Sequence, residues 1–176
     1  MGSATSEKIT ILHITEQDLS NITTLQPMIE ENVPEIVDSC HRTILVIPQL
    51  ETIINQYSSV EKLRQTLTRH FIELFNGVID DEFVEKRLCV AMIHYRIGLK
   101  PDWYMGVFQT LQEWVIQSVF ELESQSDRQV VLIQSSLKLL NLKQQIVVEK
   151  YEEGNFRQQS QQYEQINLDL KGKFLT

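Results

Sequence analysis

The sequence predicts a single all-α domain, and three observations support this. The 176-residue chain contains only four prolines and six glycines, and long segments run without either. Apolar residues recur at the three- and four-residue spacing of amphipathic helices. The length and the 42% apolar content allow one domain with a hydrophobic core. About seven helices are expected.

The first helix signal is a capping-box-like start at Thr15, so residues 1–14 are expected to form a flexible leader. The chain start formally matches an N-myristoylation pattern, but such short matches arise by chance. The helix that begins after Thr15 is expected to be interrupted near Pro27. Pro34 should then open a separate helix that ends before Pro48.

Three further helices are predicted in the middle of the chain. A short one carries Leu50, Ile53 and Ile54, and a second begins after the cap at Ser59. The second has one apolar stripe, which Thr66 and His70 border. A third begins at the acidic pair Asp80-Asp81 and closes at Gly98. Its aligned apolar and aromatic positions include Phe83, Val90, Ala91 and Ile97.

The last two predicted helices are long. One begins at Pro101, and the other begins near Arg128 and is apolar on two sides. That breadth predicts packing within the protomer and against a partner, so we expect a homodimer formed through these two helices. Residues 156–176 are glutamine-rich at their start and are expected to form a linker helix toward an output domain outside this sequence.

Composition excludes several classes of protein. The formal net charge of −8 argues against a nucleic-acid-binding protein, which needs clustered Lys and Arg. No run approaches the roughly 20 apolar residues of a membrane span, and no secretion signal is visible. Cys40 and Cys89 lack the spacing of a disulfide framework or a zinc site. A cytoplasmic location is expected.

Sequence motifs for catalysis are scarce, and we do not expect an enzyme. There is no GxSxG elbow and no HExxH, and the carboxylate pairs lie on polar segments at predicted helix ends. Among the four histidines, His94 lies in the most apolar context. From position alone it is either a hydrogen-bonded core residue or a ligand, and core histidines are the more common case.

A continuous segment around His94 changes that balance. The segment runs over residues 78–108 and includes Ile93-His94-Tyr95-Arg96-Ile97-Gly98-Leu99 and Trp103-Tyr104-Met105-Gly106. It strongly resembles the globin-coupled sensor family, and the resemblance covers residues 25–142. It implies a globin-like helical sandwich around haem b over residues 15–155, with an extra N-terminal helix. It also implies that His94 is the proximal iron ligand.

The resemblance further suggests which residues surround the haem. Tyr104 corresponds to the residue that hydrogen-bonds the proximal histidine, although its place on an apolar stripe also fits an ordinary core aromatic. The apolar walls would be formed by Leu63, Leu67, Met92, Ile97, Trp103 and Val107, each of which could instead be plain core.

The distal side departs from the family. Its members usually have a tyrosine where the ungapped correspondence places His41, while the distal Thr66 is retained. His41 could coordinate iron or donate a hydrogen bond to a bound ligand, and we favour the hydrogen bond. Thr66 could orient a ligand or could simply bond back to a helix carbonyl.

The resulting hypothesis is a haem-based gas sensor that binds oxygen or another diatomic gas reversibly and passes the signal downstream. Two alternatives remain open at this stage. One is a haem enzyme that processes oxygen or peroxide, although no flavin or nicotinamide fingerprint is present to supply electrons. The other is an interaction module that has kept the fold without haem.

Overall fold

Seven α-helices make up the described part of the chain. The computed structural model describes the backbone of residues 2–174 and, within it, the side chains of residue 2 and residues 4–165. The helices are α1 (Ser3–Ile11), α2 (Glu16–Leu45), α3 (Pro48–Tyr57), α4 (Val60–Leu74), α5 (Asp81–Arg96), α6 (Pro101–Leu122) and α7 (Ser126–Phe174). No strand occurs in residues 2–174. The predicted all-α class is confirmed.

The helix starts follow the capping signals in the sequence. Thr15 and Asp18 form a reciprocal capping box at the start of α2. The side chain of Ser59 accepts a hydrogen bond from the Lys62 amide, and that of Asp80 accepts one from the Phe83 amide at 2.7 Å. Each cap satisfies an amide that has no partner within its helix. Gly98 ends the α5 region at φ 75°, a conformation that glycine adopts without strain.

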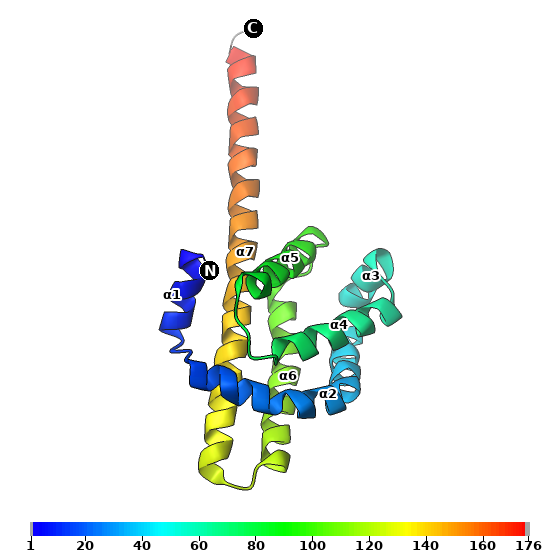
Figure 1. Cartoon of the computed structure of the whole chain (residues 1–176). Helices are drawn as coiled ribbons and strands as arrows, with labels where there is room; N and C mark the ends of the chain where they lie inside the picture. The colour runs from blue at the N-terminus through cyan, green and yellow to red at the C-terminus, as the bar shows by residue number, and fades with distance from the viewer. Residues whose placement is uncertain (1, 175–176) are drawn as a thin grey trace.

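The prediction that the helix after Thr15 is interrupted near Pro27 and that a separate helix begins at Pro34 is wrong. A single helix, α2, continues through both prolines. Each proline removes one backbone hydrogen bond and would cost about 3 kcal/mol in an isolated helix. The buried face of α2 is nevertheless unbroken on both sides of the prolines. Burial of that face offsets the lost bonds, and Figure 1 shows the last turns of α2 running in a different direction from its first turns.

The N-terminal segment also differs from the expected flexible leader. Residues 3–11 form α1, which packs beside α7 (Figure 1). Lys8 on α1 pairs with Glu149 on α7 at 2.7 Å. The weak apolar periodicity of this segment gives little helix signal, and the contact with α7 supplies the stabilisation.

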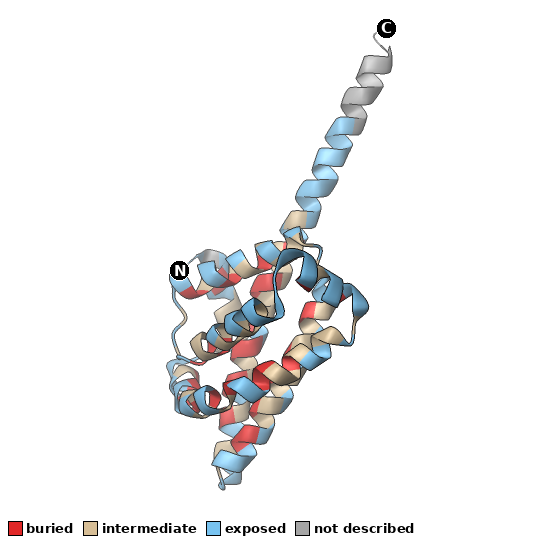
Figure 2. Ribbon diagram, turned by 90° about the vertical axis from the view of Figure 1, so that its right-hand side faces the viewer, coloured by how far each residue is buried: buried red, intermediate tan, exposed pale blue. Residues whose placement is uncertain are grey.

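The core lies between α2, α4, α5, α6 and α7, and Figure 2 shows the buried residues concentrated where these helices meet. α7 then leaves the domain, and residues 155–165 of its extension are exposed. The predicted linker helix is therefore continuous with α7 as far as Phe174, and residues 175–176 lie outside the described range.

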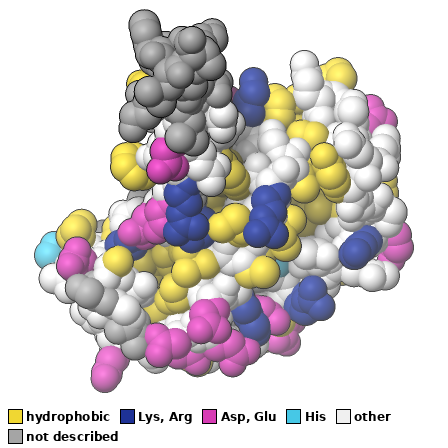
Figure 3. Space-filling model, turned by 90° about the horizontal axis from the view of Figure 1, so that it is seen from above, with side chains coloured by type: hydrophobic (Ala, Val, Ile, Leu, Met, Phe, Trp, Pro, Cys, Tyr) yellow, Lys and Arg dark blue, Asp and Glu magenta, His cyan; other side chains and the backbone are white. Residues whose placement is uncertain are grey.

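The surface charge is mixed at the end from which α7 leaves. Figure 3 shows Asp and Glu side chains gathered along one edge of this face, while Lys and Arg side chains are separated by hydrophobic and uncharged ones.

Within residues 2–174, no helix has both the length and the apolar character needed to cross a bilayer.

Candidate functional site

A cavity of about 180 Å³ lies between α4, α5 and α6. α3 closes one side, and α2 and α7 contribute one residue each. Its lining is mostly apolar, and no Asp or Glu is among the residues that line it. These residues are Ile44, Leu50, Ile53, Ile54, Leu63, Thr66, Leu67, His70, Phe71, Val90, His94, Ile97, Leu99, Trp103, Tyr104, Val107, Phe108, Leu111 and Lys143.

His94 enters the cavity from the last turn of α5. Its Nδ1 atom is buried and has no hydrogen-bond partner. Burial, and secondarily the charge of Lys143, lower the pKa of His94 to about 4. The imidazole is therefore neutral near pH 7, which is the form that binds a metal through one nitrogen and donates a hydrogen bond through the other.

Tyr104, in the first turns of α6, lies against His94. The two ring centroids are 5.4 Å apart, and the rings are tilted by 58°. The Tyr104 hydroxyl is also buried without a hydrogen-bond partner, and burial raises its pKa, so the phenol stays protonated. Two unpartnered polar groups, one imidazole nitrogen and one hydroxyl, thus lie together at an otherwise apolar wall.

Most of the expected pocket residues come together around this cavity. Leu63, Leu67, Ile97, Trp103 and Val107 all line it. Met92 does not. It lies in a surface groove with Tyr95, Lys150 and Gly154. Met92 precedes His94 by two residues, which is about 200° around an α-helix, so the two side chains point to different faces of α5.

The expected distal residues are placed less favourably. Thr66 lines the cavity, but its hydroxyl donates to the Lys62 carbonyl at 2.8 Å, the helix back-bonding that Thr commonly makes. His41 is not among the lining residues, because α2 reaches the cavity through Ile44, nearly one turn later. The His41 Nε2 atom is buried without a hydrogen-bond partner.

The structure adds two polar residues that the sequence analysis does not place in the site. His70, one turn after Thr66 on α4, lines the cavity, and its Nε2 contacts the Nζ atom of Lys143 on α7. The sequence carries a signal for both. His70 borders the apolar stripe of its helix, and Lys143 stands three or four residues from Leu139, Leu140, Ile146 and Val147, all of which are buried.

Comparison with known proteins identifies the fold and the family. The sequence profile of the Protoglobin family matches residues 3–157. The chain belongs to the protoglobin family. The globin domain of the Geobacter sulfurreducens globin-coupled sensor superimposes with a TM-score of 0.79 at 19% identity, over 83% of this chain and 96% of that one. The predicted globin-like fold is therefore confirmed.

One relative is similar to this protoglobin over most of the length of this chain. The "Heme-based aerotactic transducer HemAT" of Halobacterium salinarum is 22% identical over 154 residues, which is 82% of this chain. The match covers 32% of that relative, so this chain spans about a third of its length. That relative is described as a heme-based aerotactic transducer, and the Geobacter protein is described as a sensor.

Proposed function

We propose that this protoglobin is a haem-based gas-sensing domain in which His94 binds the iron of haem b. The observation that carries the proposal is the placement of His94 on an apolar cavity wall, neutral and with a buried Nδ1 that lacks a hydrogen-bond partner. The aerotactic relative, which is described as heme-based, supports the same assignment.

The residues present fit a haem better than a bare metal ion. Among the described residues, no group of three or more His, Cys, Asp or Glu side chains could hold a metal ion. A single histidine on an apolar cavity suits an iron whose other ligands come from a porphyrin. The haem supplies an iron centre that binds diatomic gases reversibly. The flat apolar walls would come from Leu63, Leu67, Ile97, Trp103 and Val107.

Tyr104 is proposed to orient His94. The phenol lies beside the imidazole, and both groups lack partners, so the Nδ1–H of His94 can donate to the Tyr104 oxygen after a small rotation of either ring. Such a bond would fix the tautomer of the imidazole, leave Nε2 available to hold the haem iron and raise the basicity of the ligand. Trp103 beside it helps to exclude water from this wall.

For the distal side, we propose that Thr66 and His41 contact the ligand. The structure supports Thr66 more strongly than His41, because only Thr66 lines the cavity. Thr66 lines the cavity, and its oxygen can still accept a hydrogen bond from water while its hydroxyl donates to the Lys62 carbonyl. His41 would have to move toward the cavity from its place on α2. The unpartnered Nε2 of His41 leaves it free to form a new bond.

We further propose that the domain is cytoplasmic and acts as a homodimer that passes its signal through α7. Large apolar side chains are exposed around the turn between α6 and α7, including Phe120, Leu122 and Val130. A partner protomer would cover them. α7 is the only described helix that both packs on α5, which carries His94, and extends beyond the domain (Figure 1). Sedimentation should give a dimer, and Phe120→Glu should split it.

An absorbance titration tests the proposed function. The purified chain, titrated with haem, should saturate at one haem per protomer with a Soret band. The reduced protein should change its spectrum reversibly when oxygen or carbon monoxide is admitted and removed. A chain that develops no Soret band would favour the haem-free interaction module. Sustained turnover with a reductant would favour a haem enzyme.

A further inference from the structure

The cavity is lined by ionisable side chains that, apart from the Tyr104 phenol, are all basic. Its lining includes one ionisable cation, Lys143, and no carboxylate. The two lining imidazoles, His70 and His94, bear partial positive charge on their N–H groups and full charge when protonated. A cavity of this kind attracts small molecules that are negatively charged.

Lys143 is the source of this polarity. It projects from α7 and is only 3% exposed. Its Nζ contacts His70 Nε2 and lies 4.7 Å from the centroid of the Phe108 ring. Burial, and then the charge of Arg87, lower its pKa well below the ordinary value of a lysine. Burial thus disfavours the charged form of the amine, and a negatively charged ligand nearby would favour it.

Arg87 adds a second buried positive charge close enough to act on Lys143. It lies on α5 two turns before His94, is 1% exposed, and its Nε and Nη2 atoms have no hydrogen-bond partner. Its guanidinium stacks on the Phe83 ring at 4.0 Å. The nearby Glu73 pairs with Lys86 at 3.5 Å rather than with Arg87. No ion pair to a carboxylate is found for Arg87 or Lys143 among the described side chains.

Buried cations without carboxylate partners reduce stability, because desolvation is not offset by an ion pair. Such an arrangement is retained where a ligand supplies the missing negative charge. The other candidate donors are less suited to this role, because the Thr66 hydroxyl is bonded to its helix and His41 lies outside the lining.

We propose that His70 and Lys143 form the polar ligand contact of this cavity and favour small ligands that carry or gain negative charge over neutral ones. The inference rests on the proposed function, because the ligand would be held at the haem iron. His70 would face the ligand, while Lys143 would donate to His70 and supply the charge. Azide represents the anionic class and carbon monoxide the neutral one.

The test uses the haem-reconstituted full chain with Lys143→Met and His70→Leu. Azide affinity of the ferric protein should fall about tenfold to a hundredfold in either variant, the range for one charge-assisted hydrogen bond. Carbon monoxide affinity of the ferrous protein should change less than about threefold, because this neutral ligand gains little from a nearby charge. Lys150→Met is the matched control. It removes the same charge from α7, but Lys150 pairs with Glu153 and does not line the cavity.

A second readout uses the haem-free protein. Lys143→Met should unfold at a higher denaturant concentration than the unsubstituted chain, because it removes a buried cation that lacks a carboxylate partner. Lower stability together with unchanged azide affinity would overturn the inference and make Lys143 a structural residue. A low-spin spectrum that either substitution abolishes would also overturn it, because the pair would then coordinate iron. If the chain binds no haem at all, the proposed function itself fails.

Discussion

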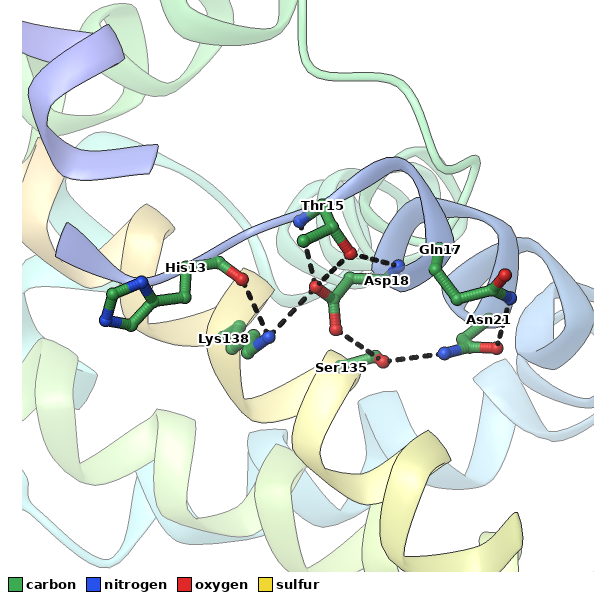
Figure 4. A network of polar contacts seen from close by, with 7 residues as sticks. All are labelled: His13, Thr15, Gln17, Asp18, Asn21, Ser135 and Lys138. Carbon is green, nitrogen blue, oxygen red and sulfur yellow. Dashed lines mark hydrogen bonds and ion pairs between the residues drawn. The ribbon is translucent and has the colours of Figure 1, made fainter. Parts of the chain in front are cut away.

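Two buried polar clusters in this protein differ in how well their charges are satisfied. The first joins the start of α2 to α7 (Figure 4). The carboxylate of Asp18 accepts hydrogen bonds from the Thr15 amide and hydroxyl, from Ser135 and from Lys138, all between 2.8 and 2.9 Å. The second cluster is His70 and Lys143 on the cavity wall, where no carboxylate lies. It also includes Arg87, which lines a different pocket and has two guanidinium nitrogens without a hydrogen-bond partner.

The difference separates a structural role from a ligand-binding one. Satisfied buried charges fix the relative position of two helices, and removing one of them leaves its partners unpaired. Arg87 and Lys143 contact aromatic rings but pair with no carboxylate among the described side chains, and we propose that a ligand supplies the missing negative charge. Substitutions in the first cluster should therefore change stability, and those in the second should change ligand binding.

The largest expected loss of stability follows from Asp18→Ala. It leaves Ser135 and the charged Lys138 without their carboxylate, and the free energy of unfolding should fall by about 2–4 kcal/mol. Denaturant unfolding measures this change, and the Soret spectrum should not shift. Glu16→Gln is the control, because Glu16 is exposed in the same helical turn and its loss should cost less than about 1 kcal/mol. Equal effects of the two substitutions would refute the structural role of the network.

Acid should weaken the first cluster selectively. Burial raises the pKa of Asp18, but hydrogen bonds from Lys138, Thr15 and Ser135 outweigh it and lower the pKa from 3.8 to about 2. The folded chain thus binds fewer protons at this site than the unfolded chain does, so its stabilising contribution is complete above pH 3.8 and is lost as the pH falls toward 2. The difference in unfolding free energy between the unsubstituted chain and Asp18→Asn should shrink over this interval. A constant difference would contradict the assignment.

A smaller effect is expected where α5 packs on α7 beyond the cavity. Tyr95, next to His94, lies so close to Gly154 that an added Cβ would be 2.7 Å from its ring, and its hydroxyl donates to Gln158 at 3.1 Å. Gly154→Ala should lower stability by about 1–2 kcal/mol through overpacking and shift the haem spectrum slightly.

Gly106→Ala provides the matched control for this contact. It also lies within a helix, but nothing is within 4 Å of an added Cβ, so stability should rise by about 0.5–1 kcal/mol. Combining Gly154→Ala with Tyr95→Leu should recover most of the loss. If both alanine substitutions stabilise the protein equally, Tyr95 does not constrain α7.

Local sequence signals predicted most of the fold. Side-chain caps at Thr15, Ser59 and Asp80 mark the starts of three helices, because capping depends on neighbours along the chain. The continuity of α2 through its prolines could not be predicted in this way, since it depends on burial against other helices. The same holds for α1, which is stabilised by packing on α7.

The candidate site was predictable only in part. Resemblance to a family brought His94 and Tyr104 together, and the structure places their rings in contact. The resemblance also suggested Met92, but this side chain lies on a different face of α5 from His94. Lys143 was missed because a lysine on a long helix is ordinarily solvated, and only the packing of α7 against α4 and α6 side chains reveals its burial.

The central claim is that His94 holds the iron of a haem, and replacing its imidazole tests this most directly. Reconstituted His94→Gly should lack the ferrous spectrum of an imidazole-bound haem, and added free imidazole should restore that spectrum by occupying the space left by the side chain. His13→Asn is the control. His13 has φ 51°, which asparagine tolerates, and it lies outside the cavity, so its spectrum should be unchanged. An unaltered ferrous spectrum in His94→Gly without imidazole would contradict the claim and assign the iron to another residue.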